Sequence, residues 1–136
     1  MAVLAGCGGG GSQALTKEQY AAKADAICDE HNKETQSLGN PANLADLAQI
    51  ADKTLTILDK AISELDALKR PASEKATADQ WMEQVKNLRN DLKQIRDKAK
   101  DNDLKGVRGI AATAQEHNAK SNTLATELGM SICNKD

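Results

Sequence analysis

The sequence predicts an all-α protein, an antiparallel up-down-up-down four-helix bundle with one disulfide. Helix-forming residues dominate the 136 positions, and apolar residues recur three and four positions apart in four segments, as on the buried face of a helix. Pro41 and Pro71 are the two prolines. The chain has no Phe, one Trp and one Tyr, so its core depends on Leu, Ile, Val and Ala, a composition that favours helices over strands.

The first two helices are expected at 17–38 and 44–69. Thr16 and Gln19 have the spacing of a capping box before the first, and Gly-Asn-Pro ends it. Asn43 is the expected N-cap of the second. The second helix has the broadest apolar face, which is formed by Leu47, Ala51, Thr54, Leu58, Ala61, Leu65 and Leu68.

The third helix is expected to begin at Ser73 or Thr77 and to end near residue 100, with Thr77 and Gln80 as a second capping box. Asp-Asn-Asp at 101–103 predicts a turn that supplies the next N-cap. The fourth helix is expected at 104–128, followed by a C-cap at Gly129. Glycines at 106 and 109 each cost about 1 kcal/mol relative to Ala, so this helix starts late or has soft first turns.

The up-down topology brings the start of the first helix, the end of the second, the start of the third and the end of the fourth to one end of the bundle. We therefore expect both aromatic residues at the end that carries the disulfide. The residues expected there are Tyr20, Cys28, Leu65, Trp81, Leu124 and Cys133.

The N-terminal region contains a second signal. Leu4-Ala5-Gly6-Cys7 has the form of a lipobox, in which the Cys7 thiol receives a diacylglycerol and becomes the new N-terminus. Residues 8–12 then form a flexible Gly/Ser tether, and the acyl chains give a stable membrane anchor. Six residues before Cys7 are fewer than a signal peptide needs. Either translation starts upstream or the sequence is trimmed; the alternative is an ordinary start and a Gly-rich tail, with Cys7 a free thiol.

Three cysteines leave one unpaired in an exported domain. If Cys7 carries lipid, Cys28 and Cys133 form the natural pair, and closing that loop stabilises the fold by up to about 4–5 kcal/mol in the chain-entropy model. The alternative is two reduced, buried thiols. The mixed charges, with a net charge of −2, lack the basic stripe of a nucleic-acid-binding protein.

Two histidines, in Glu30-His31-Asn32 and Glu116-His117-Asn118, fall on the apolar seams. Imidazoles from facing helices could hold a metal or haem iron in the bundle core, although neither histidine has a carboxylate three residues before it and no Cys-x-x-Cys-His occurs. The simpler interpretation is a hydrogen bond from each to Ser121, Thr35, an Asn or water. A third is a protonation switch, in which His⁺ beside an apolar seam loosens the bundle.

The motifs together resemble small actinobacterial cell-envelope lipoproteins of unknown function. The resemblance covers nearly the whole chain and rests on the lipobox, the Gly-rich tether and the cysteines in the first helix and after the last, together with the residues Tyr20, Ala24, Asp25, Ala26, Ile27, Asn32, Pro71, Trp81 and Gly129. These motifs are structural, so the resemblance implies a location and a fold and leaves the mechanism open.

We therefore expect residues 1–15 to be the end of a lipoprotein signal, the lipidated Cys7 and the tether, and residues 16–136 to be the bundle domain. The expected function is that of a non-enzymatic envelope lipoprotein, held on the extracytoplasmic face of the cell membrane. It would act as a protein-interaction or binding module without a cofactor, with an envelope protein as its possible partner. The alternative is a small-ligand, metal or haem carrier with a site near His31 and His117.

Overall fold

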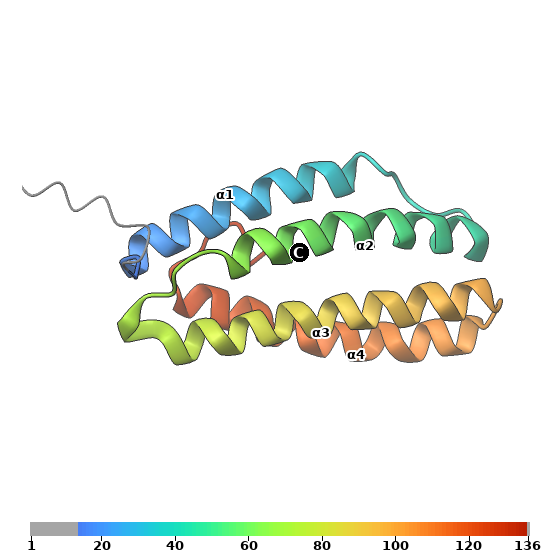
Figure 1. Cartoon of the computed structure of the whole chain (residues 1–136). Helices are drawn as coiled ribbons and strands as arrows, with labels where there is room; N and C mark the ends of the chain where they lie inside the picture. The colour runs from blue at the N-terminus through green and yellow to red at the C-terminus, as the bar shows by residue number, and fades with distance from the viewer. Residues whose placement is uncertain (1–13, 136) are drawn as a thin grey trace, which may run out of the picture.

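The computed structural model describes residues 14–135 and contains four long helices that pack against one another (Figure 1). No strand occurs within these residues. The helices are α1 (Lys17–Gln36), α2 (Leu44–Asp66), α3 (Lys75–Lys100) and α4 (Leu104–Glu127), with a short 3-10 turn, η1 (Ala72–Glu74), before α3. The predicted all-α bundle with a disulfide is confirmed.

Consecutive helices make the closest packing in this bundle, α1 with α2, α2 with α3 and α3 with α4. Figure 1 shows α2 and α3 running alongside each other in opposite directions, with α4 returning beside α3. The blue α1 lies next to α2 and diverges from it toward the loop that joins them. Between residues 14 and 135, no helix is both long enough and apolar enough to cross a membrane.

Most helix ends follow the predicted capping chemistry. The Thr16 hydroxyl accepts from the Gln19 backbone N–H at 3.1 Å, and Oε1 of Gln19 accepts from the Thr16 backbone N–H at 3.0 Å. Asn43 caps α2 through a 2.9 Å bond from the N–H of Asp46. Gly129 has φ +83° just beyond α4, the left-handed geometry that favours glycine at this position.

The N-cap of α4 explains why a glycine occurs at position 106. Asp103 caps the helix by accepting a 2.8 Å bond from the Gly106 N–H. A Cβ on Gly106 would collide with that same Asp103 side chain, so the glycine makes room for the cap. The helix begins at Leu104, the first residue of the predicted range, so the late start that the two glycines suggested is wrong.

The predicted capping box at the start of α3 is wrong. The helix begins at Lys75, its N-cap is Glu74, and no side chain caps it. Thr77 therefore lies inside the first turn. The reason is the preceding 3-10 turn, in which the Glu74 N–H bonds the Pro71 carbonyl at 3.1 Å. Because this turn continues directly into the helix, the helical hydrogen bonding starts before Thr77.

The main core lies at the end of the bundle where the disulfide is found. Tyr20 and Trp81 meet edge-to-face there, with ring centroids 6.4 Å apart, as the topology predicted, and Leu124 and Cys133 pack against the same cluster. Its two methionines were not predicted to be buried. We call this cluster the disulfide-end core: Tyr20, Ala21, Ala24, Leu65, Ala78, Trp81, Met82, Ala125, Leu128 and Met130.

The opposite end has a smaller core, formed by Ala48, Ala99 and Val107, which we call the far-end core. Along the side of the bundle between the two ends, α2 and α3 are joined by a ladder of ion pairs. Its carboxylates stand seven residues apart on α2. The ladder comprises Asp52 with Arg96 at 3.0 Å, Asp59 with Arg89 at 2.8 Å and Asp66 with Lys86 at 3.0 Å.

Candidate functional site

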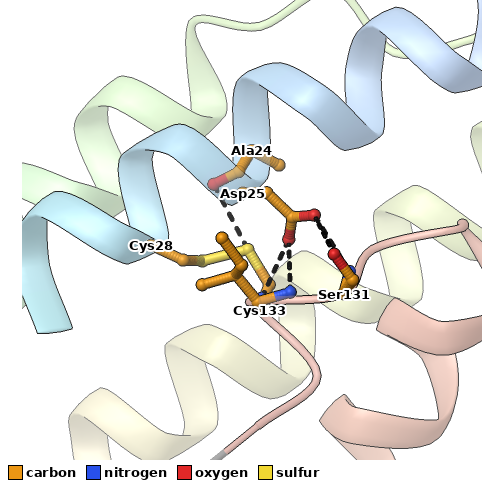
Figure 2. Close-up of a disulfide and its surroundings, with 6 residues drawn as sticks. Ala24, Asp25, Cys28, Ser131 and Cys133 are labelled. Atoms are coloured by element: carbon orange, nitrogen blue, oxygen red, sulfur yellow. Dashed lines mark hydrogen bonds between the residues drawn. A yellow bond between two sulfur atoms is a disulfide. The ribbon is translucent and has the colours of Figure 1, made fainter.

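The disulfide joins the middle of α1 to the segment after α4. Cys28 and Cys133 are bonded, with Cα atoms 5.4 Å apart and a sequence separation of 105, which confirms the predicted pair. Figure 2 shows Asp25, one turn before Cys28, facing the same segment. The Cys133 sulfur also lies 3.2 Å from the carbonyl oxygen of Ala24.

Asp25 fixes that segment through its carboxylate. Oδ1 accepts from the backbone N–H groups of Ile132 and Cys133, each at 2.9 Å, and Oδ2 accepts from the Ser131 N–H at 2.9 Å and from its hydroxyl at 3.3 Å. Partial burial raises the pKa of Asp25, but these bonds outweigh it and the pKa is lowered overall. We call Asp25, the disulfide and residues 131–133 the latch; its role is structural.

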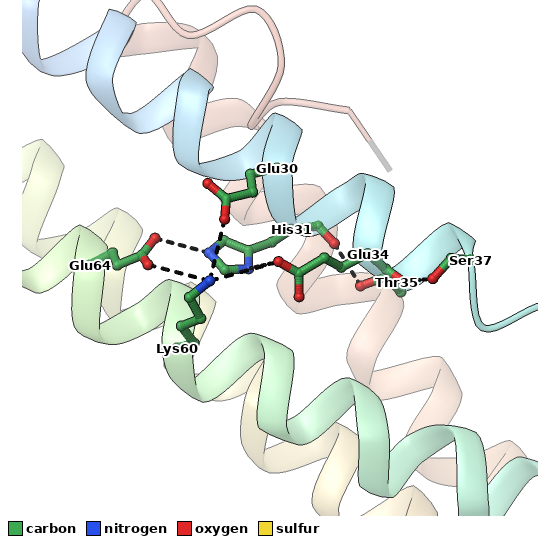
Figure 3. Close-up of polar contacts among 7 residues, drawn as sticks. All are labelled: Glu30, His31, Glu34, Thr35, Ser37, Lys60 and Glu64. Atoms are coloured by element: carbon green, nitrogen blue, oxygen red, sulfur yellow. Dashed lines mark hydrogen bonds and ion pairs between the residues drawn. The ribbon is translucent and has the colours of Figure 1, made fainter.

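The first histidine is part of a polar cluster between α1 and α2 (Figure 3). His31 is 5% exposed, and its Nε2 donates to Oε2 of Glu64 at 3.0 Å. The other ring nitrogen, Nδ1, is buried without a hydrogen-bond partner and lies 3.9 Å from Oε1 of Glu34. The bond from His31 is the main cause of the lowered pKa of Glu64.

The Lys60 ammonium occupies the centre of this cluster. Its Nζ lies 3.3 Å from Glu30, 3.8 Å from Glu34 and 3.9 Å from Glu64, and the bond with Glu30 is the main cause of the raised pKa of Lys60. A lysine among carboxylates takes the place that a metal ion would need. Within residues 14–135, no group of three or more His, Cys, Asp and Glu side chains could hold a metal ion.

The second histidine joins α3 to α4. Nδ1 of His117 lies 2.6 Å from Oδ2 of Asp91, and Asp91 is 4% exposed. A buried carboxylate needs such a charge-assisted bond because its desolvation is costly. The sequence did not predict this buried aspartate, because charged side chains on helices are mostly exposed.

Each histidine ring bonds a carboxylate on the neighbouring helix, which the sequence did not predict. Thr35 instead donates to the backbone carbonyl of His31 at 2.9 Å. The spacing of apolar residues along one helix predicts which of its residues face inward. The hydrogen-bond partner of an inward residue depends on the axial register between two helices, and the sequence of one helix does not specify that register.

An open groove of about 630 Å³ runs between α3 and α4. Glu83 and Gln84 line its α3 wall, and Lys120 and Leu124 line its α4 wall, together with Gln80, Ala119 and Thr123. The side-chain carbonyl oxygen of Gln84 is buried and has no hydrogen-bond partner. This volume falls in the range of ligand-binding clefts.

The predicted lipidation site, Cys7, lies outside the described residues. Comparisons with protein-family models, with curated proteins and with solved structures gave no match to this chain.

Proposed function

We propose that this protein is a non-enzymatic, membrane-anchored envelope lipoprotein whose bundle binds a protein partner through the α3–α4 groove. The groove carries the proposal, because it combines an apolar floor with opposite charges on its two walls. Leu124 and Ala119 supply the apolar surface.

The partner that fits is a polypeptide segment with an apolar side chain and charges on both sides of it. Glu83 on α3 and Lys120 on α4 carry opposite charges on opposite walls of the groove. A segment that places a basic residue beside Glu83 and an acidic residue beside Lys120 complements both walls. Such charge matching fixes orientation and suppresses wrong partners.

The binding face is tested by photo-crosslinking in cells that make the full chain from its own gene. A photoreactive amino acid at Thr123, in the groove, is expected to give one discrete crosslinked protein. The matched control is the same amino acid at Lys53, an exposed position on α2. The double change Glu83→Lys and Lys120→Glu, which keeps the net charge, should abolish the crosslink. A crosslink that survives this change, equal products at both positions or no product at Thr123 would overturn the groove assignment.

The anchor is tested separately by feeding the same cells an alkyne-labelled fatty acid. The protein should incorporate the label and sediment with membranes, and Cys7→Ser should abolish both. An unlabelled wild-type protein would contradict the lipoprotein assignment and leave the groove unaffected.

Native mass spectrometry of the full chain addresses the carrier alternative. Binding through an external groove predicts the mass of the polypeptide with its lipid alone. A further stoichiometric mass that disappears on denaturation and on His117→Ala would favour a carrier.

A further inference from the structure

We infer that Asp25 is a positioning residue for the disulfide: it holds Cys133 beside Cys28 in the reduced, folded chain, so that the bond can open and re-form without unfolding. The contacts in Figure 2 carry this assignment, independently of the α3–α4 groove. The four hydrogen bonds of Asp25 with residues 131–133 are non-covalent, and none of their atoms is lost when the S–S bond is reduced.

The helix places the carboxylate and the first sulfur on the same side. Asp25 and Cys28 stand three residues apart on α1, and residues at this spacing are neighbours on one face of a helix. Cys133 meets both of them, because its backbone N–H donates to Oδ1 of Asp25 at 2.9 Å while its sulfur is bonded to Cys28. The hydrogen bond therefore acts on the residue whose sulfur has to be aimed.

The carboxylate is the main contact that fixes this segment on α1. All three backbone N–H groups of residues 131–133 donate to it, and bonds to an ionised acceptor are stronger than those between neutral groups. Partial burial raises the pKa of Asp25, but these bonds lower it overall, so the group is ionised at neutral pH. In the dithiol, the Cys133 thiol can also donate to the carbonyl oxygen of Ala24, which lies 3.2 Å from its sulfur.

The core anchors the chain just before this segment. Met130 is 3% exposed, and its N–H donates to the carbonyl of Ala125 at 2.9 Å. Three residue steps beyond Met130 span at most about 10 Å, so Cys133 stays near α1 after reduction. A disulfide needs a narrower placement, with the two Cα atoms about 4.4–6.8 Å apart and the Cβ atoms facing each other. The bonds to Asp25 supply the restriction that this short tether leaves open.

The disulfide re-forms by exchange with another disulfide, for which oxidised glutathione is the probe. One protein thiolate attacks a sulfur of oxidised glutathione, which forms a mixed disulfide and releases one glutathione thiolate. The second protein thiolate then attacks the protein sulfur of the mixed disulfide, closes the Cys28–Cys133 bond and releases the other glutathione thiolate. The two protein thiols lose two electrons to the oxidant, and their two protons pass to the released thiolates. Asp25 acts on the second, intramolecular step.

A glutathione equilibrium of the full chain with Cys7→Ser, at neutral pH, tests this role. Alkylation after acid quenching and intact mass spectrometry give the fractions of dithiol, mixed disulfide and disulfide, and hence the effective concentration of the two thiols. Asp25→Asn should lower that concentration about tenfold, and the mixed disulfide should accumulate. The matched control is Val107→Ala, which removes apolar packing at the far end and should stay within about twofold of the Cys7→Ser parent.

Equal shifts in the two variants would assign the effect to lost stability and overturn the positioning role, as would an unchanged Asp25→Asn. Loss of the helical circular dichroism signal in the reduced parent would also overturn it, because Asp25 acts from a folded α1. If reduced Asp25→Asn fails to fold, hydrogen exchange of the reduced parent decides the question. The amides of residues 131–133 should exchange nearly as slowly as in the oxidised protein, and exchange as fast as in an unstructured peptide would contradict the assignment.

Discussion

The two ends of the bundle are built from different kinds of side chain. At the disulfide end, Tyr20, Trp81, Met82 and Leu128 are each less than 2% exposed, and a covalent bond lies beside them. The far-end core contains two alanines and one valine, and Leu104 nearby is 46% exposed. Hydrophobic stabilisation grows with the apolar area removed from water, so most of it belongs to the disulfide end.

The residues that contribute most to the stability of the fold differ from those that specify how its helices are aligned. Large side chains and the latch concentrate stability where the first and last parts of the described chain meet. The α2–α3 ladder, with carboxylates at a seven-residue interval, instead sets the sliding position of two long helices. Exposed ion pairs contribute little energy each, but they penalise a wrong register. Four experiments test this difference between the two ends and the ladder.

Removing the disulfide should have the largest effect. Cys28→Ser with Cys133→Ser, in a Cys7→Ser background, is expected to lower the free energy of unfolding by about 4–5 kcal/mol in the chain-entropy model, because the bond closes a long loop. Urea denaturation followed by circular dichroism measures the change. The single variant Cys7→Ser is the control and should match the wild type. A loss below about 1 kcal/mol would show that packing alone holds the disulfide end.

The second-largest loss of stability is expected from a cavity in the disulfide-end core. Trp81→Ala is expected to cost about 3–5 kcal/mol, because the indole is 1% exposed and packs on Tyr20. Val107→Ala at the far end removes two carbon atoms from the side chain and should lower the free energy of unfolding by about 1–2 kcal/mol. Circular dichroism is the suitable probe, since Trp81 is the single tryptophan. Equal losses at the two sites would remove the asymmetry between the ends.

The latch should make the stability of the disulfide end depend on acid. Asp25→Asn keeps the shape but removes one acceptor oxygen, and should cost about 1–2 kcal/mol at pH 7. The folded-state pKa of Asp25 lies below its ordinary value of 3.8. The carboxylate therefore stabilises the fold fully above that value, and the contribution is lost as pH falls through the lower folded-state pKa. Unfolding of both proteins between pH 2 and 7 should show their difference shrinking below about pH 3.8. A constant difference would contradict this role.

The smallest effect is expected in the ladder. A double-mutant cycle with Asp59→Asn and Arg89→Gln should give a coupling energy below about 1 kcal/mol, since Asp59 is 53% exposed. The coupling should fall further in 1 M salt because of screening. A coupling that is large and insensitive to salt would mean that the ladder stabilises the bundle as well as setting its register.

The sequence predicted the disulfide end well because several independent signals agree there. Cysteine counting gave the Cys28–Cys133 pair, helical spacing gave the inward positions, and the up-down topology brought Tyr20 and Trp81 together. Local capping patterns at Thr16, Asn43 and Asp103 were also correct, since a cap depends on residues within one turn.

The candidate site was harder to predict because it depends on contacts between helices. The bond between His31 and Glu64 joins residues 33 positions apart, and that between His117 and Asp91 joins residues 26 apart. A shift of one turn between two helices would replace either partner while leaving every apolar seam intact. The predicted cap at Thr77 failed for a local reason, since a turn that begins at Pro71 set the helix start first.

The two sides of the latch become available at different times as the chain is made. A ribosome delivers Cys28 105 positions before Cys133, so the first thiol waits while α2, α3 and α4 emerge and pair. The carboxylate of Asp25 likewise has no segment to bind until residues 131–133 are made. During that interval Cys28 is open to pairing with any other free thiol nearby. Correct assembly therefore depends on how quickly the last turn of the chain reaches the first helix.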